Sequence, residues 1–115
     1  MSIINITNEQ IINYCGFETF DKAKQNGSNY KICLKNNFRN EITAIIQDNF
    51  FSINFVQIIF EASRILSSYC SCEQNKSIPC VHIALLLLAK NENCHRTNTF
   101  KYNILATSFK EIQFC

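Results

Sequence analysis

The chain has 115 residues, of which 47% are hydrophobic and 12% aromatic, and its formal net charge is +2. A chain of this length builds one core, so we expect a single domain over residues 1–115. The small net charge gives no global electrostatic reason to bind nucleic acid or a membrane, so any such binding must come from a local patch. The longest apolar run, Ile83 to Ala89, is far shorter than the ~20 residues that span a bilayer.

Two short helices are expected near the start of the chain. The stretch from Thr7 to Gln10 fits a capping box, and Gly16 suits the left-handed residue that ends a helix. A second helix over residues 17–25 would end at Asn26-Gly27, which is a strong turn signal. No secretion signal is apparent, because residues 1–13 alternate polar and apolar side chains. We therefore expect an intracellular protein, cytoplasmic or nuclear, with reduced cysteines.

Four strands are expected after these helices. Apolar residues recur with a period of two over residues 30–35, and Asn36-Asn37 predicts a turn. The β-branched stretch 41–47, the aromatic stretch 50–60 and residues 65–69 predict three further strands. Because the connections are short, an antiparallel sheet of about four strands is the simplest arrangement.

The second half of the chain predicts two more helices. Ile83 to Ala89 is apolar on all sides, which indicates a helix covered by the sheet and by the C-terminal tail. Residues 91–99 are polar and typical of a loop. Leu105, Phe109 and Ile112 follow a helical spacing, so residues 102–114 predict a C-terminal amphipathic helix. The fold class expected from all these elements is α+β.

Four residues between the last strand and the apolar helix have the chemistry of a metal site: Cys70, Cys72, Cys80 and His82. Three thiolates and an imidazole are ligands that Zn²⁺ prefers, and together they close a tetrahedral shell. Residues two apart in an extended chain point to the same face, so Cys70 and Cys72 can reach one ion. The seven residues 73–79 would form a knuckle between the two pairs. We predict one structural zinc ion.

This pattern of Cys-x-Cys, a short loop and Cys-x-His before a hydrophobic helix resembles the SWIM-type zinc finger. The motif covers residues 70–82, and the resemblance extends at lower specificity over about residues 14–90. SWIM modules occur in transposases, helicases and partners of recombinase paralogues, which implies a role in binding DNA or protein. Glu73 stands where a proline is usual and Val81 where a basic residue is usual. Neither is a ligand, but Val81 removes a positive charge from beside the site.

Other readings of the cysteines are open. The thiols could be paired as disulfides in a secreted scaffold, although the number of cysteines, seven, is odd. A Cys-x-Cys redox pair is a further reading, but it would not call for Cys80 and His82. Cys94-His95 lies about twelve residues beyond His82, or about 18 Å along a helix, which is too far to share the ion. The remaining cysteines are expected to be ordinary: Cys15, Cys33 and Cys115.

Basic residues gather in one stretch that contains no acidic residue: Lys22, Lys24, Lys31, Lys35 and Arg39. With Tyr30 and Phe38 interleaved, this stretch could contact phosphates, and Lys76 lies in the knuckle. The alternative is a solvated strand face. The candidate residues for weak nucleic-acid contact are Lys31, Lys35, Arg39 and Lys76.

The function expected from these observations is that of a non-enzymatic zinc-binding interaction module. The resemblance implies protein or DNA contacts in recombination, transposition or helicase-associated processes. We expect a protein partner to bind more tightly than DNA, and we expect no small-molecule substrate. One alternative is a shortened relative or fragment of a larger SWIM-containing helicase or transposase, although the chain lacks the Gly-Lys-Ser/Thr loop of an ATPase. A thiol-redox enzyme is the other alternative, but a closed Cys₃His shell leaves no position for an activated water.

Overall fold

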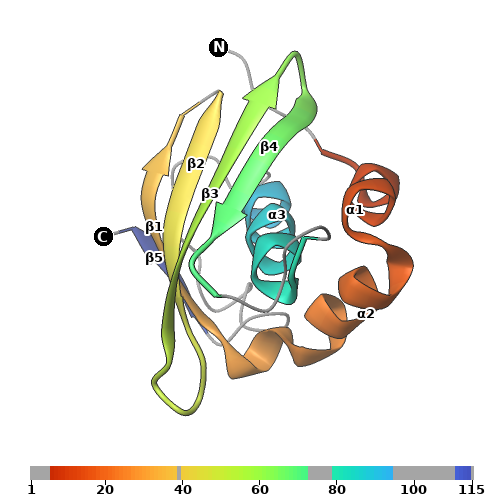
Figure 1. Cartoon of the computed structure of the whole chain (residues 1–115). Helices are drawn as coiled ribbons and strands as arrows, with labels where there is room; N and C mark the ends of the chain where they lie inside the picture. Colours follow the sequence, from red (N-terminus) through yellow and green to blue (C-terminus); the bar gives the residue numbers. More distant parts are fainter. Residues whose placement is uncertain (1–5, 39, 73–78, 95–110, 115) are drawn as a thin grey trace.

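In this computed structural model the described residues form a five-stranded sheet and three α-helices, and all three helices lie on the same side of the sheet (Figure 1). The structure describes residues 6–38, 40–72, 79–94 and 111–114. Within those residues, every helix is too short or too polar to traverse a lipid bilayer. The α+β class predicted from the sequence is confirmed.

Two short helices open the described part of the chain, as predicted. Helix α1 spans Asn8–Cys15, and its capping box is complete because Thr7 and Gln10 exchange hydrogen bonds in both directions. Gly16 ends α1 with a φ of 94°, a conformation that favours glycine, and the chain turns there into α2, Phe17–Asn26. A single 3₁₀ turn, η1, Gly27–Asn29, then leads into the sheet.

The first four strands form the predicted antiparallel sheet, and a fifth strand adds to one edge. The strands are β1, Lys31–Asn37, β2, Glu41–Gln47, β3, Ile53–Glu61, β4, Arg64–Cys70, and β5, Glu111–Phe114. Their order across the sheet is β4-β3-β2-β1-β5, and β5 runs parallel to β1. Among the described residues, β4 therefore forms one edge of the sheet and carries Cys70 at its end.

Two predicted turn and strand boundaries were wrong. The turn at Asn36-Asn37 does not form, because a bulge after Leu34 lets both residues stay paired with β2. The third strand begins at Ile53 and not at Phe50. The side chain of Asp48 accepts hydrogen bonds from the backbone N–H groups of Phe50 and Ser52, each at 2.9 Å, and this closes a turn before the strand.

The hairpin between β3 and β4 is closed by Ala62 and Ser63, both with positive φ. Positive φ at both central residues is the conformation of the two-residue turns that match the twist of a hairpin. The side chain of Gln10 donates to the carbonyl of Ser63 at 3.1 Å, which ties the start of α1 to this hairpin. The tight turn keeps β4 in register, with Cys70 opposite Val56.

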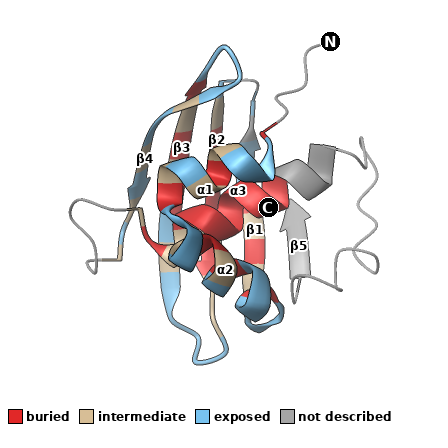
Figure 2. Ribbon diagram, turned by 90° about the vertical axis from the view of Figure 1, so that its right-hand side faces the viewer, coloured by how far each residue is buried: buried red, intermediate tan, exposed pale blue. Residues whose placement is uncertain are grey.

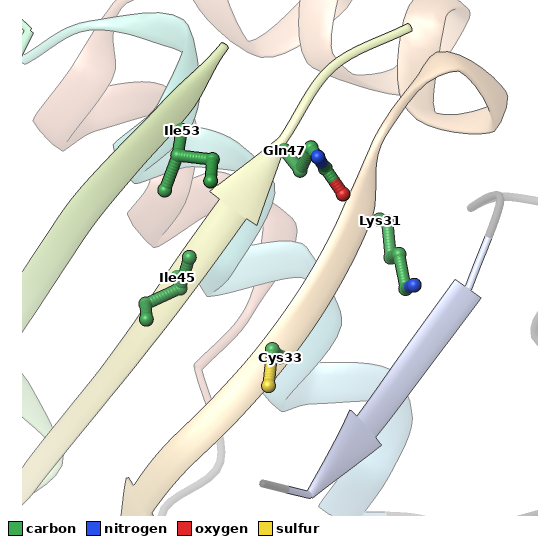
Figure 3. A pocket seen from close by; sticks show the side chains of 5 residues that line it. All are labelled: Lys31, Cys33, Ile45, Gln47 and Ile53. Carbon is green, nitrogen blue, oxygen red and sulfur yellow. The ribbon is translucent and has the colours of Figure 1, made fainter. Parts of the chain in front are cut away.

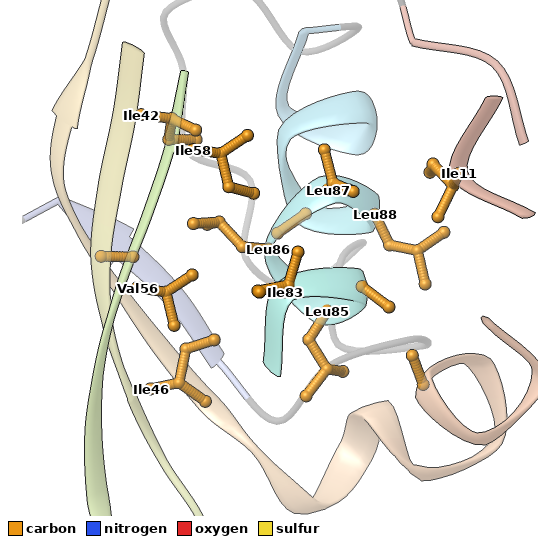
Figure 4. Packing of buried hydrophobic residues seen from close by; sticks show 14 of the residues in the cluster. Ile11, Ile42, Ile46, Val56, Ile58, Ile83, Leu85, Leu86, Leu87 and Leu88 are labelled. Atoms are coloured by element: carbon orange, nitrogen blue, oxygen red, sulfur yellow. The ribbon is translucent and has the colours of Figure 1, made fainter. Parts of the chain in front are cut away.

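Helix α3, Val81–Cys94, occupies the centre of the molecule. Its residues from Ile83 to Lys90 are all buried, with Ile42, Ile46, Val56 and Ile58 of the sheet on one side and α1 and α2 on the other (Figures 2 and 4). The helix is longer than predicted, since residues 91–94 are helical and not a loop. The Nζ atom of Lys90 lies 5.7 Å from the ring centroid of Phe60, so this buried ammonium meets an aromatic face. The predicted cover by the C-terminal tail lies outside the described residues.

The predicted C-terminal amphipathic helix is wrong at residues 111–114. These residues form β5, which pairs with β1 in the register Ile32 opposite Ile112. The open edge of β1 offers backbone hydrogen-bonding groups, and pairing with them overrides the helical spacing of the side chains. Residues 102–110 lie outside the described part of the chain.

The packing around α3 predicts where stability resides. Leu86 is fully buried on this helix, so Leu86→Ala should lower the free energy of unfolding by about 2–5 kcal/mol through lost burial and a cavity. Leu66 on β4 is 54% exposed and provides the matched control. Leu66→Ala should change the free energy of unfolding by less than about 0.5 kcal/mol. Denaturant unfolding of the zinc-loaded protein measures both. Equal losses for the two variants would contradict the central position of α3.

Candidate metal centre

The first ligand pair sits where the edge strand β4 ends. Cys70 is the last residue of β4, and its pairing with the buried Val56 places its side chain on the inner face of the sheet. The chain stays extended beyond it, because the N–H of Ser71 donates to the carbonyl of Phe55 at 2.9 Å. Cys72 therefore returns to the face of Cys70, and its N–H donates to the Cys70 sulfur at 3.5 Å.

The second pair sits where α3 begins. The carbonyl of Cys80 accepts from the N–H groups of Ile83 and Ala84 at 3.1 and 3.3 Å, so Cys80 precedes the first helical turn. His82 lies in that turn, two residues on. Because α3 packs under β3 and β4, its start faces the end of β4.

The structure brings these four residues together. One ligand atom from each of Cys70, Cys72, Cys80 and His82 lies within 4.8 Å of all the others. The Nδ1 atom of His82 is 3.6 Å from the sulfur of Cys70 and 3.6 Å from the sulfur of Cys80. A tetrahedral zinc ion with ordinary Zn–S and Zn–N bonds would separate sulfur and nitrogen by about 3.6 Å. The residues present therefore fit one zinc ion bound through Nδ1.

The sulfur atoms interact strongly with one another. The pKa of the Cys80 thiol is lowered, first because it accepts a hydrogen bond from Cys70 and then because His82 also donates to it, while burial acts in the opposite direction. The pKa of the Cys70 thiol is raised, since it is the donor in the hydrogen bond to Cys80 and is partly buried. A thiolate is the form of cysteine that binds a metal, so Cys80 already favours the ligating state.

The centre has the properties of a structural zinc site. Four protein side chains complete a tetrahedral shell, which leaves no open position for water or substrate. Cys80 is 8% exposed, and Cys70 and Cys72 are half-buried beside the core. Bound zinc would supply a cross-link between the end of β4 and the start of α3.

None of the other cysteines that the structure describes belongs to this centre. Cys15 is a buried free thiol, and burial, with the nearby Cys80 second, raises its pKa to about 12. It is the ordinary buried cysteine that we expected. Cys33 on β1 is half-buried and disulfide-bonded, so the expectation of a free thiol there was wrong. Cys94 ends α3, about 18 Å of helix from His82. His95 and Cys115 lie outside the described residues.

The candidate basic residues are divided between two layers. Lys31 and Lys35 lie on β1, whereas Lys22 and Lys24 lie on α2. The two other candidates for nucleic-acid contact, Arg39 and Lys76, lie outside the part of the chain that the structure describes.

Nothing in the sequence indicated that two further residues, Asn54 and Tyr30, lie beside the metal centre. Asn54 on β3 lies 3.4 Å from the Nε2 atom of His82, and the ring of Tyr30 meets the His82 ring edge-on at 6.0 Å between centroids. Both are distant from His82 along the chain, so only sheet pairing and the docking of α3 bring them there.

Comparison with known protein families gives one match, which covers the metal centre. The family model of the SWIM zinc finger matches residues 54–91, which include most of β3, all of β4 and most of α3. The resemblance to the SWIM zinc finger that the sequence indicated is therefore confirmed over these residues. No curated protein and no solved structure matches the chain.

The ligand set predicts one zinc ion per chain, measurable by native mass spectrometry of the reduced protein. Cys80→Ser removes a ligand and should lose most of the bound zinc, because a tetrahedral site needs all four donors. Cys15→Ala changes a buried cysteine that is not a ligand and should keep one zinc. Full zinc occupancy in Cys80→Ser would refute the assignment.

Removal of the metal should loosen the centre more than the sheet. Apparent binding free energies of about 10–16 kcal/mol act as folding energy in small zinc modules. A strong chelator should therefore speed hydrogen exchange in residues 70–72 and 79–90 more than in β1 and β2. Unchanged exchange in those residues after verified zinc removal would show that the metal does not stabilise them.

Proposed function

We propose that the chain is a non-enzymatic, zinc-stabilised interaction module whose main ligand is a polypeptide. The observation that carries this proposal is the apolar surface of the sheet opposite the helices. On β3 the alternation is clear: Val56 and Ile58 are buried under α3, whereas Ile53 and Phe55 are 62% and 41% exposed. We call this surface the outer sheet face and define it by Ile45, Ile53, Phe55, Ile59 and Tyr69.

The outer sheet face is broad and mostly uncharged at its centre. Tyr69 on β4 is 55% exposed, and Phe50 and Phe51 in the adjoining turn are 87% and 77% exposed. A shallow hollow of about 200 Å³ opens on the same face (Figure 3). Its lining comes from β1, β2 and β3: Lys31, Cys33, Ile45, Gln47 and Ile53. Contiguous exposed apolar surface of this kind is typical of protein interaction sites.

DNA is the weaker ligand in this proposal. The basic run of the sequence is divided between a helix, α2, and a strand, β1, so its lysines do not follow one face of a single element. Val81, at the position where SWIM modules usually have a basic residue, is half-buried against the core beside the metal centre. The net charge of +2 adds little long-range attraction.

The cellular role that follows is recruitment in recombination, transposition or helicase-associated processes, as the SWIM family implies. The chain would bring a partner of this machinery into place and perform no chemistry itself. Support for the absence of catalysis comes from the complete Cys₃His shell. The same role would hold if the chain were one arm of a larger helicase or transposase.

The order of affinities can be tested by titration at near-physiological salt. Fluorescent single-stranded and duplex oligonucleotides should bind the zinc-loaded chain with Kd of about 10⁻⁶–10⁻⁴ M, falling steeply in affinity as salt rises. Reversal of Lys31, Lys35 and Arg39 to Glu should abolish this binding. Nanomolar DNA affinity of the isolated chain would overturn the proposal and place direct nucleic-acid binding first.

The second half of the test measures the affinity for a protein partner. The polypeptide that co-purifies with the chain is identified by mass and then titrated as pure protein. It should bind more tightly than the oligonucleotides, and the three charge reversals should leave its affinity largely intact. Phe55→Ser on the outer sheet face should weaken the affinity for the partner. Phe17→Ser on α2, which is more exposed than Phe55 (63% against 41%) but lies in the helical layer, should not. Equal effects of the two Phe variants would remove the outer sheet face as the binding surface.

A further inference from the structure

The imidazole ring of His82 has a polar neighbour on its far side, away from the cysteine sulfur atoms. Its Nδ1 atom faces Cys70 and Cys80 at 3.6 Å, and its Nε2 atom lies 3.4 Å from the carboxamide nitrogen of Asn54. The ring of Tyr30 meets the imidazole at an interplanar angle of 86°. Asn54 comes from β3, so this contact joins the sheet to the first turn of α3.

Asn54 is a polar residue on the inner, otherwise apolar face of β3. The residues of β3 that share its inner face are apolar and buried, as in Val56, Ile58 and Phe60. Asparagine is also among the residues depleted in strands. A polar side chain at this position calls for a polar partner, and the nearest described partners of the carboxamide are His82 and Ser71.

Zinc binding decides which atom of His82 carries a proton. A neutral imidazole has one N–H, and a metal on Nδ1 takes the lone pair there, so the proton must be on Nε2. Nε2–H then needs an acceptor. The two ends of a carboxamide have nearly the same shape, and the hydrogen-bond network decides which end faces which partner.

The surrounding network accommodates the carboxamide with its oxygen toward His82. In that orientation Nδ2 of Asn54 faces the Ser71 hydroxyl, which lies 3.3 Å from the other end of the carboxamide. The Ser71 oxygen accepts from the N–H of Phe55 at 2.9 Å and has a second lone pair to accept from Asn54. The His82 N–H and both ends of the Asn54 carboxamide then have partners, and the O–H of the exposed Ser71 is left to donate to solvent.

We propose that Asn54 is the positioning residue of the zinc centre. In the zinc-loaded protein its carboxamide oxygen accepts the Nε2–H of His82 and holds the ring with Nδ1 toward the metal, while Ser71 holds the carboxamide. Such outer partners of a ligating histidine typically change metal affinity by about 10–100-fold. The inference rests on the zinc centre and not on the identity of the partner.

The test measures zinc affinity by competition with a chromophoric chelator in the full chain. Asn54→Leu should lower the affinity about 10–100-fold, whereas Asn54→Asp keeps an acceptor oxygen and should stay within a few-fold of the unchanged protein. Gln57→Leu is the matched control, because Gln57 lies on the same strand but bonds Glu41 and not the metal centre. It should leave the affinity unchanged.

A second readout separates positioning from simple packing. In ¹⁵N-labelled, zinc-loaded protein, the His82 ring shifts should report a metal-bound Nδ1 and a protonated Nε2, and the Nε2–H should exchange faster with water in Asn54→Leu. A proton on Nδ1, unchanged affinity in Asn54→Leu, or equal losses in Asn54→Leu and Asn54→Asp would each overturn the proposal. If the unchanged protein bound no zinc, the metal centre itself would be refuted.

Discussion

The burial of helix α3 is the constraint on which the rest of this structure depends. Every residue from Ile83 to Lys90 is at most 8% exposed, so no face of this part of the helix is in contact with water. Such a helix is unstable alone and must be enclosed. The inner face of the sheet covers one side, and the apolar stripes of α1 and α2, with Ile11 and Phe20 buried, cover the other. The two short N-terminal helices are therefore part of the core and not appendages.

The zinc centre lies at the two places where this arrangement is weakest. An edge strand and the first turn of a helix both have unpaired backbone groups, and they are where fraying begins. Two ligands come from the end of β4 and two from the start of α3, so the metal joins these ends directly. A contribution of about 10–16 kcal/mol is as large as the whole stability of a typical small domain, about 5–15 kcal/mol. The metal is thus a main determinant of the fold in this region.

The alternation of side chains along β3 separates the buried core from the outer sheet face. Its inward side chains, such as Val56 and Ile58, pack on α3, while Ile53 and Phe55 point to the outer sheet face. Because successive residues of a strand face opposite sides, one segment serves both purposes, and a change on one face leaves the other in place. Asn54 is the polar exception on the inward side, and it lies near the start of β3, beside the metal centre. In the function we propose, a rigid, metal-fixed core behind an exposed apolar sheet would be a preorganised surface, which would lower the cost of binding a partner.

The amino-acid sequence by itself determined the features that depend on neighbours a few residues apart. The capping box at Thr7, the strand Glu41–Gln47 and the spacing of the Cys₃His motif are local patterns, because caps, strand alternation and ligand pairs are set by short-range geometry. The tertiary structure alone decided the strand at residues 111–114, where pairing with β1 prevailed over a helical side-chain period. It also decided that Asn54 meets His82 and that the outer sheet face stays without a covering helix among the described residues. The physical reason is that contacts between distant segments depend on how whole elements pack, and no short stretch of sequence contains that information.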